Sequence, residues 1–314
     1  MSRAESVSAD EHYTKNLAIA TYLVAHRLMS TEGDSKQKKK MKRVLKRKRD
    51  LINETFATER LSYRKQFAEL LTTDVPPSEA KTLFIDLAFS NPFSPYELKY
   101  SNKDFTEALK KVAARFDVEA DTISSILKTK KDASKAHRNV DWIKILGMGA
   151  AGVVVLGIGG YALAPVIGAK LGAAAGLAGA AASAHGLALL GGGTLAAGGA
   201  GMAGGLWLVT GTSAVVGGTA LSGGALLHQI GAAGARVELT KLQVTYKEVL
   251  LQNQMHVIKA QEAVKKLSSE RDQLKKMLKE ERDLNDKNAS RVQEVEEKLK
   301  AIESSMQWME EEAA

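Results

Sequence analysis

Residues 166–185 have the sequence VIGAKLGAAAGLAGAAASAH, which is mostly glycine and alanine with a few larger apolar residues. The same composition extends over residues 145–235, where Lys170 is the single Lys, Arg, Asp or Glu. In a water-exposed helix interior each glycine costs about 1 kcal/mol relative to alanine. In lipid the backbone must satisfy its own hydrogen bonds, which enforces helix, and small residues let helices approach closely. This stretch therefore predicts a block that inserts into a membrane, and a soluble core packed through Ala and Gly is the alternative.

The Gly-rich block, residues 141–235, divides into segments that each approach the roughly 20 residues needed to cross a bilayer. The segments are 145–163, 166–185, 187–209 and 211–231. The spacing of small residues predicts helix-packing faces at Gly168, Gly172, Gly176, Gly201 and Gly205. We therefore expect two glycine-zipper hairpins, with either two or four transmembrane helices.

Three residues between 145 and 235 are candidates for a pore or for gating: Lys170, His185 and His228. Histidine titrates near pH 6.5, so the two histidines would respond to mild acid. The alternatives are that Lys170 reaches the interface with its long side chain, and that both histidines lie in interfacial loops.

Basic residues on both sides of the block indicate its orientation. They are Lys128, Lys130, Lys131, Lys135 and Arg138 before it, and Arg236 and Lys241 after it. Positive charge favours the cytosolic side, so both termini are expected in the cytosol and the spans are even in number. The first ten residues are polar and acidic and do not resemble a signal peptide. We expect an intracellular membrane protein, with a soluble form before insertion also permitted.

Residues 1–140 predict a soluble all-α domain that senses or binds a protein partner. They carry 27 Lys and Arg against 19 Asp and Glu, so the positive excess of the chain lies here. Apolar residues at helical spacing and Gly or Pro breaks predict five helices. The first contains the apolar positions from Leu17 to Leu28, before a break at Ser30 to Ser35, and the others cover approximately 36–71, 78–89, 105–116 and 120–127.

Ten of the 14 residues from Lys36 to Arg49 are basic. We predict that this run binds anionic lipid headgroups, at about 1 kcal/mol per residue near the surface. A merely solvated helix face is an equal alternative, and nucleic acid is less favoured because no aromatic residue lies within the run. The predicted lipid-binding residues are Lys38, Lys39, Lys40, Lys42, Arg43, Lys46, Arg47, Lys48 and Arg49.

Residues 236–314 predict one long helix and a coiled coil, because no Gly or Pro follows Gly234 and a heptad pattern continues to the end. Polar residues interrupt the seam from Glu281 to Asn288. Asn285 and Asn288 resemble register-setting residues, so we expect a homo-oligomer, with folding back onto the N-terminal domain as the alternative. The apolar seam positions are Val264, Leu267, Leu274, Leu278, Val292, Val295, Leu299, Ile302, Met306 and Met309.

Motifs for catalysis or cofactor binding are weak. Gly147, Gly149 and Gly152 formally match GxGxxG, but no acidic residue follows about 20 positions later to bind a ribose. No phosphate-binding GxxxxGK[ST] or zinc-binding HExxH motif occurs, cysteine is absent, and the six histidines are scattered. We therefore expect no enzyme, no cofactor and no metal site.

Two segments resemble known protein families. The runs 168–176, 190–199 and 217–224 of the Gly-rich block resemble the membrane-inserting segments of apolipoprotein-L-like proteins and, more loosely, of pore-forming colicins. That resemblance implies helices that insert in membranes and in some cases form ion pathways. The Glu32-Gly33-Asp34 turn after an apolar helix is similar to TerB-like helical domains.

The sequence thus predicts an all-α protein in three parts, with domains at 1–140, 141–235 and 236–314. The expected function is a non-enzymatic, pore-forming or membrane-perturbing effector of the toxin or defence type. Two alternatives are a membrane-anchored coiled-coil scaffold or tether without conduction, and a membrane-anchored nucleic-acid-binding protein.

Overall fold

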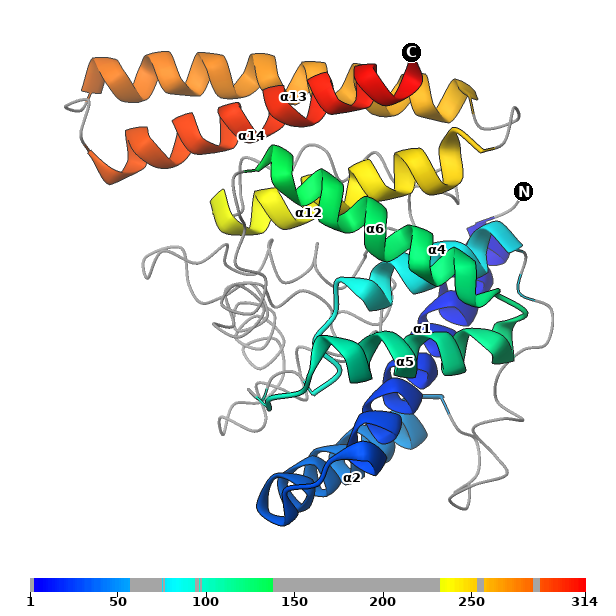
Figure 1. The fold of residues 1–314 in the computed structure, drawn as a ribbon. Helices are drawn as coiled ribbons and strands as arrows, with labels where there is room; N and C mark the ends of the chain where they lie inside the picture. The colour runs from blue at the N-terminus through cyan, green and yellow to red at the C-terminus, as the bar shows by residue number, and fades with distance from the viewer. Residues whose placement is uncertain are drawn as a thin grey trace.

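The structure is a computed structural model, and it confirms the all-α class for the part of the chain that it describes (Figure 1). Within that part there are helices and turns and no strand. The described residues are 3–56, 75, 77–93, 96, 98–137, 232–252, 257–284 and 289–314.

The described helices follow one another in the order α1 (Arg3–Thr31), α2 (Ser35–Phe56), α4 (Pro77–Ala88), α5 (Asn102–Ala113), η1 (Ala114–Phe116), α6 (Ala120–Ala136), α12 (Ala232–Thr245), η4 (Tyr246–Leu250), α13 (Val257–Leu284) and α14 (Ser290–Ala313). η1 is a short 3-10 turn and η4 is a π-helical turn. Helix α6 continues nine residues beyond the predicted end at 127, and the end of the predicted 36–71 helix lies outside the described residues.

The N-terminal helices assemble around α1, which packs against α2, α4 and α5. Their core consists of aliphatic and aromatic side chains, among them Ile19, Phe84, Ile85 and Leu109, each with 1% or less of its surface exposed. Helix α5 begins at a side-chain cap, because the Ser101 hydroxyl accepts a hydrogen bond from the Asp104 backbone N–H at 3.0 Å. Apolar residues spaced three or four apart give α5 one buried face, whereas residues 16–22 of α1 and 82–88 of α4 are buried on every side of the helix.

Helix α12 lies between the N-terminal helices and the C-terminal hairpin, and it packs against α4, α6 and α14 (Figure 1). Val237 and Val244 belong to the same apolar core as the N-terminal helices. Ala235 and Leu239 belong to a second core with α13 and α14. The helix that follows the Gly-rich block is therefore built into one body with the residues that precede the block.

Helices α13 and α14 form an antiparallel pair, so the prediction of one long helix from residue 237 onward is wrong. Helix α13 ends at Leu284 and α14 begins at Ser290, within or just after the polar interruption of the seam. A polar seam offers no apolar surface to bury, so a chain reversal costs little there. The seam positions Leu267, Leu274, Leu278, Val292, Val295, Ile302 and Met309 are buried within the chain. Asn285 and Asn288 lie outside the described residues.

The prediction of transmembrane helices in a membrane protein has to be corrected. Among the described residues, no helix combines the length and the apolar character that a bilayer crossing requires. The four candidate spans of the Gly-rich block lie outside the described residues. The transmembrane assignment therefore has no support in the structure.

Glu270 of α13 is a buried carboxyl group in the C-terminal hairpin. Glu270 has 3% of its surface exposed, and burial raises the pKa of its carboxyl group to about 7. A carboxyl group in this environment is more stable as the neutral acid, because the charged form has lost its hydration.

Glu270 predicts a pH dependence of stability. Since its pKa is raised in the folded state, its contribution is fully present below its ordinary pKa of 4.5 and is lost as the pH rises through about 7. We expect Glu270→Gln to reduce the fall in the free energy of unfolding between these two pH values. Urea denaturation over this range measures the effect, and Glu262→Gln, at an exposed position of the same helix, is the matched control. Parallel pH profiles for Glu270→Gln and the wild type would contradict this role of Glu270.

Candidate functional site

Helix α2 begins in a capped turn that fixes its direction. The Asp34 carboxylate accepts hydrogen bonds from the backbone N–H groups of Lys36, at 2.7 Å, and of Gln37, at 3.2 Å. Met41, Val44 and Leu45 are buried where α2 packs against α1. Because these apolar residues recur every three or four positions, they hold one face of α2 inward and turn the opposite face to solvent.

The outward face of α2 is entirely cationic. It consists of eight exposed residues, Lys36, Lys38, Lys39, Lys40, Lys42, Arg43, Lys46 and Arg47, which we call the basic face. No Asp or Glu lies between Ser35 and Asp50 to compensate this charge. Helix α2 is at the end of the molecule opposite to α13 and α14 (Figure 1). Charges of one sign gathered at a protruding end produce a potential that attracts polyanions.

Two residues of the predicted lipid-binding run do not belong to the basic face. Lys48 has 7% of its surface exposed, and burial lowers its pKa to about 7. Arg49 is half-buried and pairs with Asp50 at 2.8 Å. The sequence could not distinguish these two residues from their neighbours. Consecutive basic residues occupy every side of the helix, so their spacing does not show which of them are buried.

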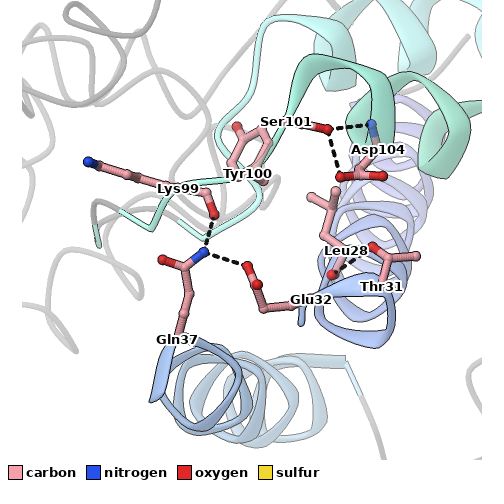
Figure 2. Close-up of a pocket in the computed structure, with 8 residues that line it drawn as sticks. All are labelled: Leu28, Thr31, Glu32, Gln37, Lys99, Tyr100, Ser101 and Asp104. Atoms are coloured by element: carbon pink, nitrogen blue, oxygen red, sulfur yellow. Dashed lines mark hydrogen bonds between the residues drawn. The ribbon is translucent and has the colours of Figure 1, made fainter. Parts of the chain in front are cut away.

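A pocket of about 270 Å³ lies where α1 ends and α2 begins, close to the start of α5 (Figure 2). Gln37 crosses it, since its Nε2 donates to the Lys99 carbonyl at 2.7 Å and to the Glu32 carboxylate at 2.5 Å. The hydrogen bond from the Asp34 backbone N–H is the largest cause that lowers the pKa of Glu32. Asp104 is held by Ser101 at 2.6 Å. Both carboxylates of the pocket thus serve local turns and helix caps.

The Glu32-Gly33-Asp34 turn is where the TerB-like resemblance lies, and here it connects α1 to α2. Within the described residues, no group of three or more His, Cys, Asp or Glu side chains is placed to hold a metal ion. The hydrogen bonds from Lys36 and Gln37 to Asp34 in this turn set the start of the helix that carries the basic face.

A buried network of charged side chains joins α12 to the N-terminal helices. The Lys241 ammonium is 3.3 Å from carboxylate oxygens of both Asp86 and Glu238, and the Tyr13 hydroxyl donates to Asp86 at 2.7 Å. Lys241 and Asp86 have 1% or less of their surface exposed. Burial raises the pKa of Glu238. Burial alone lowers the pKa of Lys241, but Glu238 and Asp86 outweigh it and the net pKa is raised.

A second buried carboxylate, Glu248 of η4, continues this connection. It accepts hydrogen bonds from Thr129 at 2.6 Å and from Ser125 at 2.8 Å, and it pairs with Lys81 at 3.3 Å. The π-helical turn is therefore bonded to both α4 and α6. A carboxylate at this depth is tolerated because its oxygens are paired and hydrogen-bonded.

His137, at the end of α6, connects the last described residues before the Gly-rich block to α12 and α14. Its Nε2 lies 2.9 Å from the Gln243 side-chain oxygen of α12 and 3.3 Å from the Ser305 hydroxyl of α14. Burial lowers the pKa of His137. The point where the chain leaves the helical body is thus bonded to the later part of α12 and to α14.

Three of the flanking cations that predicted orientation, Lys130, Arg236 and Lys241, make specific contacts within the described body. Lys241 belongs to the buried network, and Arg236 pairs with Glu297 of α14 at 2.7 Å. Lys130 donates to the Ala88 carbonyl at 2.6 Å, and burial lowers its pKa to about 8. From the sequence, only the i, i+3 spacing of Glu238 and Lys241 could have indicated that Lys241 pairs with a carboxylate, since Asp86 is far away in the chain.

The remaining predicted site residues lie outside the described residues. They are Lys170, His185, His228, Gly168, Gly172, Gly176, Gly201 and Gly205. The chain matches no family model, no curated protein and no solved structure. The resemblances to apolipoprotein-L-like proteins, colicins and TerB-like domains therefore stay predictions.

The buried network predicts a large effect of removing the cation that its two carboxylates share. Lys241→Met leaves Asp86 and Glu238 without this counter-charge, so we expect a loss of about 3–5 kcal/mol in the free energy of unfolding. Lys131→Met, at an exposed position of α6, is the control and should change stability by about 0.5 kcal/mol or less. Urea denaturation checks both values. Equal midpoints for Lys241→Met and the wild type would show that the network does not hold α12 in place.

Proposed function

We propose that this chain is a non-enzymatic protein that docks peripherally on anionic phospholipid surfaces through the basic face of α2. The observation that carries the proposal is a helix whose inner face is fixed in the core and whose outer face has eight exposed cations between Lys36 and Arg47, with no acidic residue in that stretch. The site needs no insertion of α2, because phosphate groups at a lipid surface are accessible to long Lys and Arg side chains.

The geometry of the basic face suits a flat anionic surface. Lys36, Lys40, Arg43 and Arg47 follow one another at spacings of three or four residues, so they form a single stripe along the helix. Lys39 lies beside this stripe. At about 1 kcal/mol for each cation near an anionic leaflet, the stripe contributes on the order of 4 kcal/mol. Such binding is reversible and weakens as salt screens the charges.

Nucleic-acid phosphates would also attract these cations. Lipid is favoured by the composition of the same chain, because residues 145–235 are apolar and nearly without charge. His137, just before that block, lies beside α14 at the end of the described body away from α2, so it is the composition of the block, and not its position, that favours lipid. Binding to duplex nucleic acid with no binding to vesicles would overturn the lipid proposal.

A wider proposal is that the docked protein perturbs the bilayer as a non-enzymatic effector. Its support is the sequence of the Gly-rich block, including the repeated spacing of Gly168, Gly172 and Gly176. The alternative is a scaffold or tether that binds the surface without permeabilising it.

The docking proposal predicts the behaviour of a charge-neutralised variant. Replacing Lys36, Lys39, Lys40 and Arg43 with Gln should weaken binding to phosphatidylserine-containing vesicles by about 100-fold or more, because four cations at the surface are lost. Replacing Lys111, Arg115, Lys128 and Lys131 with Gln removes the same charge from exposed positions of α5, η1 and α6, and should have a small effect. Vesicle co-sedimentation at low and high salt measures both. Similar losses for the two variants would contradict docking through α2.

The effector proposal is tested by release of a small dye from the same vesicles. We expect the wild type to release dye, and Gly168→Leu/Gly172→Leu/Gly176→Leu to bind the vesicles with little release, because bulky side chains prevent close helix contact. Binding without release by the wild type would exclude the effector and leave the scaffold.

A further inference from the structure

A turn that contains Tyr96 lies against α2, on the flank of the basic face. At one end, Gln37 of α2 donates to the Lys99 carbonyl at 2.7 Å. At the other end, the Arg47 guanidinium donates to the Tyr96 hydroxyl. Gln37 and Arg47 are about 15 Å apart along an α-helix. The turn therefore follows α2 for much of the length of the basic face.

The backbone of Tyr96 is held in place from within. Its N–H donates to the Phe93 carbonyl at 3.0 Å, and its carbonyl accepts from Leu98 N–H at 3.1 Å and from Asn91 Nδ2 at 3.4 Å. Phe93 is fully buried and lies 6.0 Å from Tyr100, measured between ring centroids. The position of Tyr96 is thus fixed by residues that belong to the N-terminal core.

The side chain of Tyr96 nevertheless faces solvent. It has 36% of its surface exposed, and among the described residues only Ile258 and Leu284 are other exposed large hydrophobic residues. Those two belong to α13, at the other end of the molecule. Tyr96 is therefore an exposed aromatic residue beside the basic face, and the Arg47 guanidinium carbon is 5.7 Å from its ring centroid.

We propose that Tyr96 is an aromatic anchor that completes the basic face, with its ring entering the headgroup layer of an anionic bilayer while the cations of α2 bind lipid phosphates. This inference rests on the proposed function. Tyrosine suits the headgroup layer because its ring is apolar and its hydroxyl is polar. Arg47 has five N–H donors, so the bond to Tyr96 leaves donors for a phosphate.

An aromatic anchor and a cationic face differ in how they respond to salt. The attraction of the cations falls as ionic strength rises, whereas the transfer of a ring into the headgroup layer is insensitive to it. Loss of Tyr96 should therefore lower vesicle affinity by a similar factor at every salt concentration. Loss of cations should instead change the slope of affinity against salt.

The experiment compares Tyr96→Ser, Tyr96→Phe and the wild type in co-sedimentation with phosphatidylserine-containing vesicles over a range of salt. We expect Tyr96→Ser to weaken binding about tenfold with an unchanged salt slope, because the apolar surface of the ring is lost. Tyr96→Phe keeps the ring and should bind about as well as the wild type. Ile258→Ser removes an exposed apolar residue on α13 and should bind as the wild type does.

Each other outcome has a distinct meaning. Wild-type binding that Tyr96→Ser leaves unchanged overturns the anchor and leaves docking through α2 intact. An equal loss in Tyr96→Ser and Tyr96→Phe, or a changed salt slope, would mean that Tyr96 only positions Arg47, and this also overturns the anchor. Absence of vesicle binding by the wild type overturns both proposals. Loss of single-stranded DNA binding in Tyr96→Ser, without a change on vesicles, assigns the ring to base stacking instead.

Discussion

The arrangement of this protein depends on the buried ion pair between Lys241 of α12 and Asp86 of α4, whose charged atoms are 3.3 Å apart. Neither side chain has appreciable contact with water, and Glu238 and Tyr13 provide further polar partners. An isolated charge at this depth would be very unfavourable, so α12 and α4 are coupled: each supplies the charge that the other needs. The contact is directional as well as strong, which fixes α12 in one position against the N-terminal core.

Helix α12 connects the other described helices. One apolar face of α12 completes the N-terminal core and the other supports the hairpin of α13 and α14. His137, Gln243 and Ser305 meet at the end of α6, just before the Gly-rich block. The basic face of α2 lies at the end of the described body away from the hairpin, and no acidic residue between Ser35 and Asp50 compensates its charge. The buried charges that stabilise the fold are therefore paired inside the body, whereas the charges proposed to bind lipid lie on the surface of α2, in a stretch without acidic residues.

The sequence predicted what local periodicity can determine. The buried face of α5, the exposed cations of α2 and the buried seam positions of α13 and α14 follow from which residues recur on one face of a helix. It did not predict the burial of Lys48 and Lys241, because burial depends on elements that pack from elsewhere in the chain. The reversal after Leu284 was missed, since a polar interruption in a heptad pattern is compatible with a register-setting site as well as with a turn. Tyr96 was missed because it lies about 50 residues from the helix that it contacts.

In the proposed mode of binding, the chain docks through α2 and the Tyr96 turn while the body around α12 stays intact. Hydrogen exchange measured by mass spectrometry, with and without anionic vesicles, tests this most directly because it reports on every described helix at once. We expect slower exchange in α2 and in the peptide containing Tyr96 when vesicles are present, with α4 and α12 equally slow in both conditions. Unchanged exchange in α2, or fast exchange in α12 without vesicles, would contradict this mode of binding.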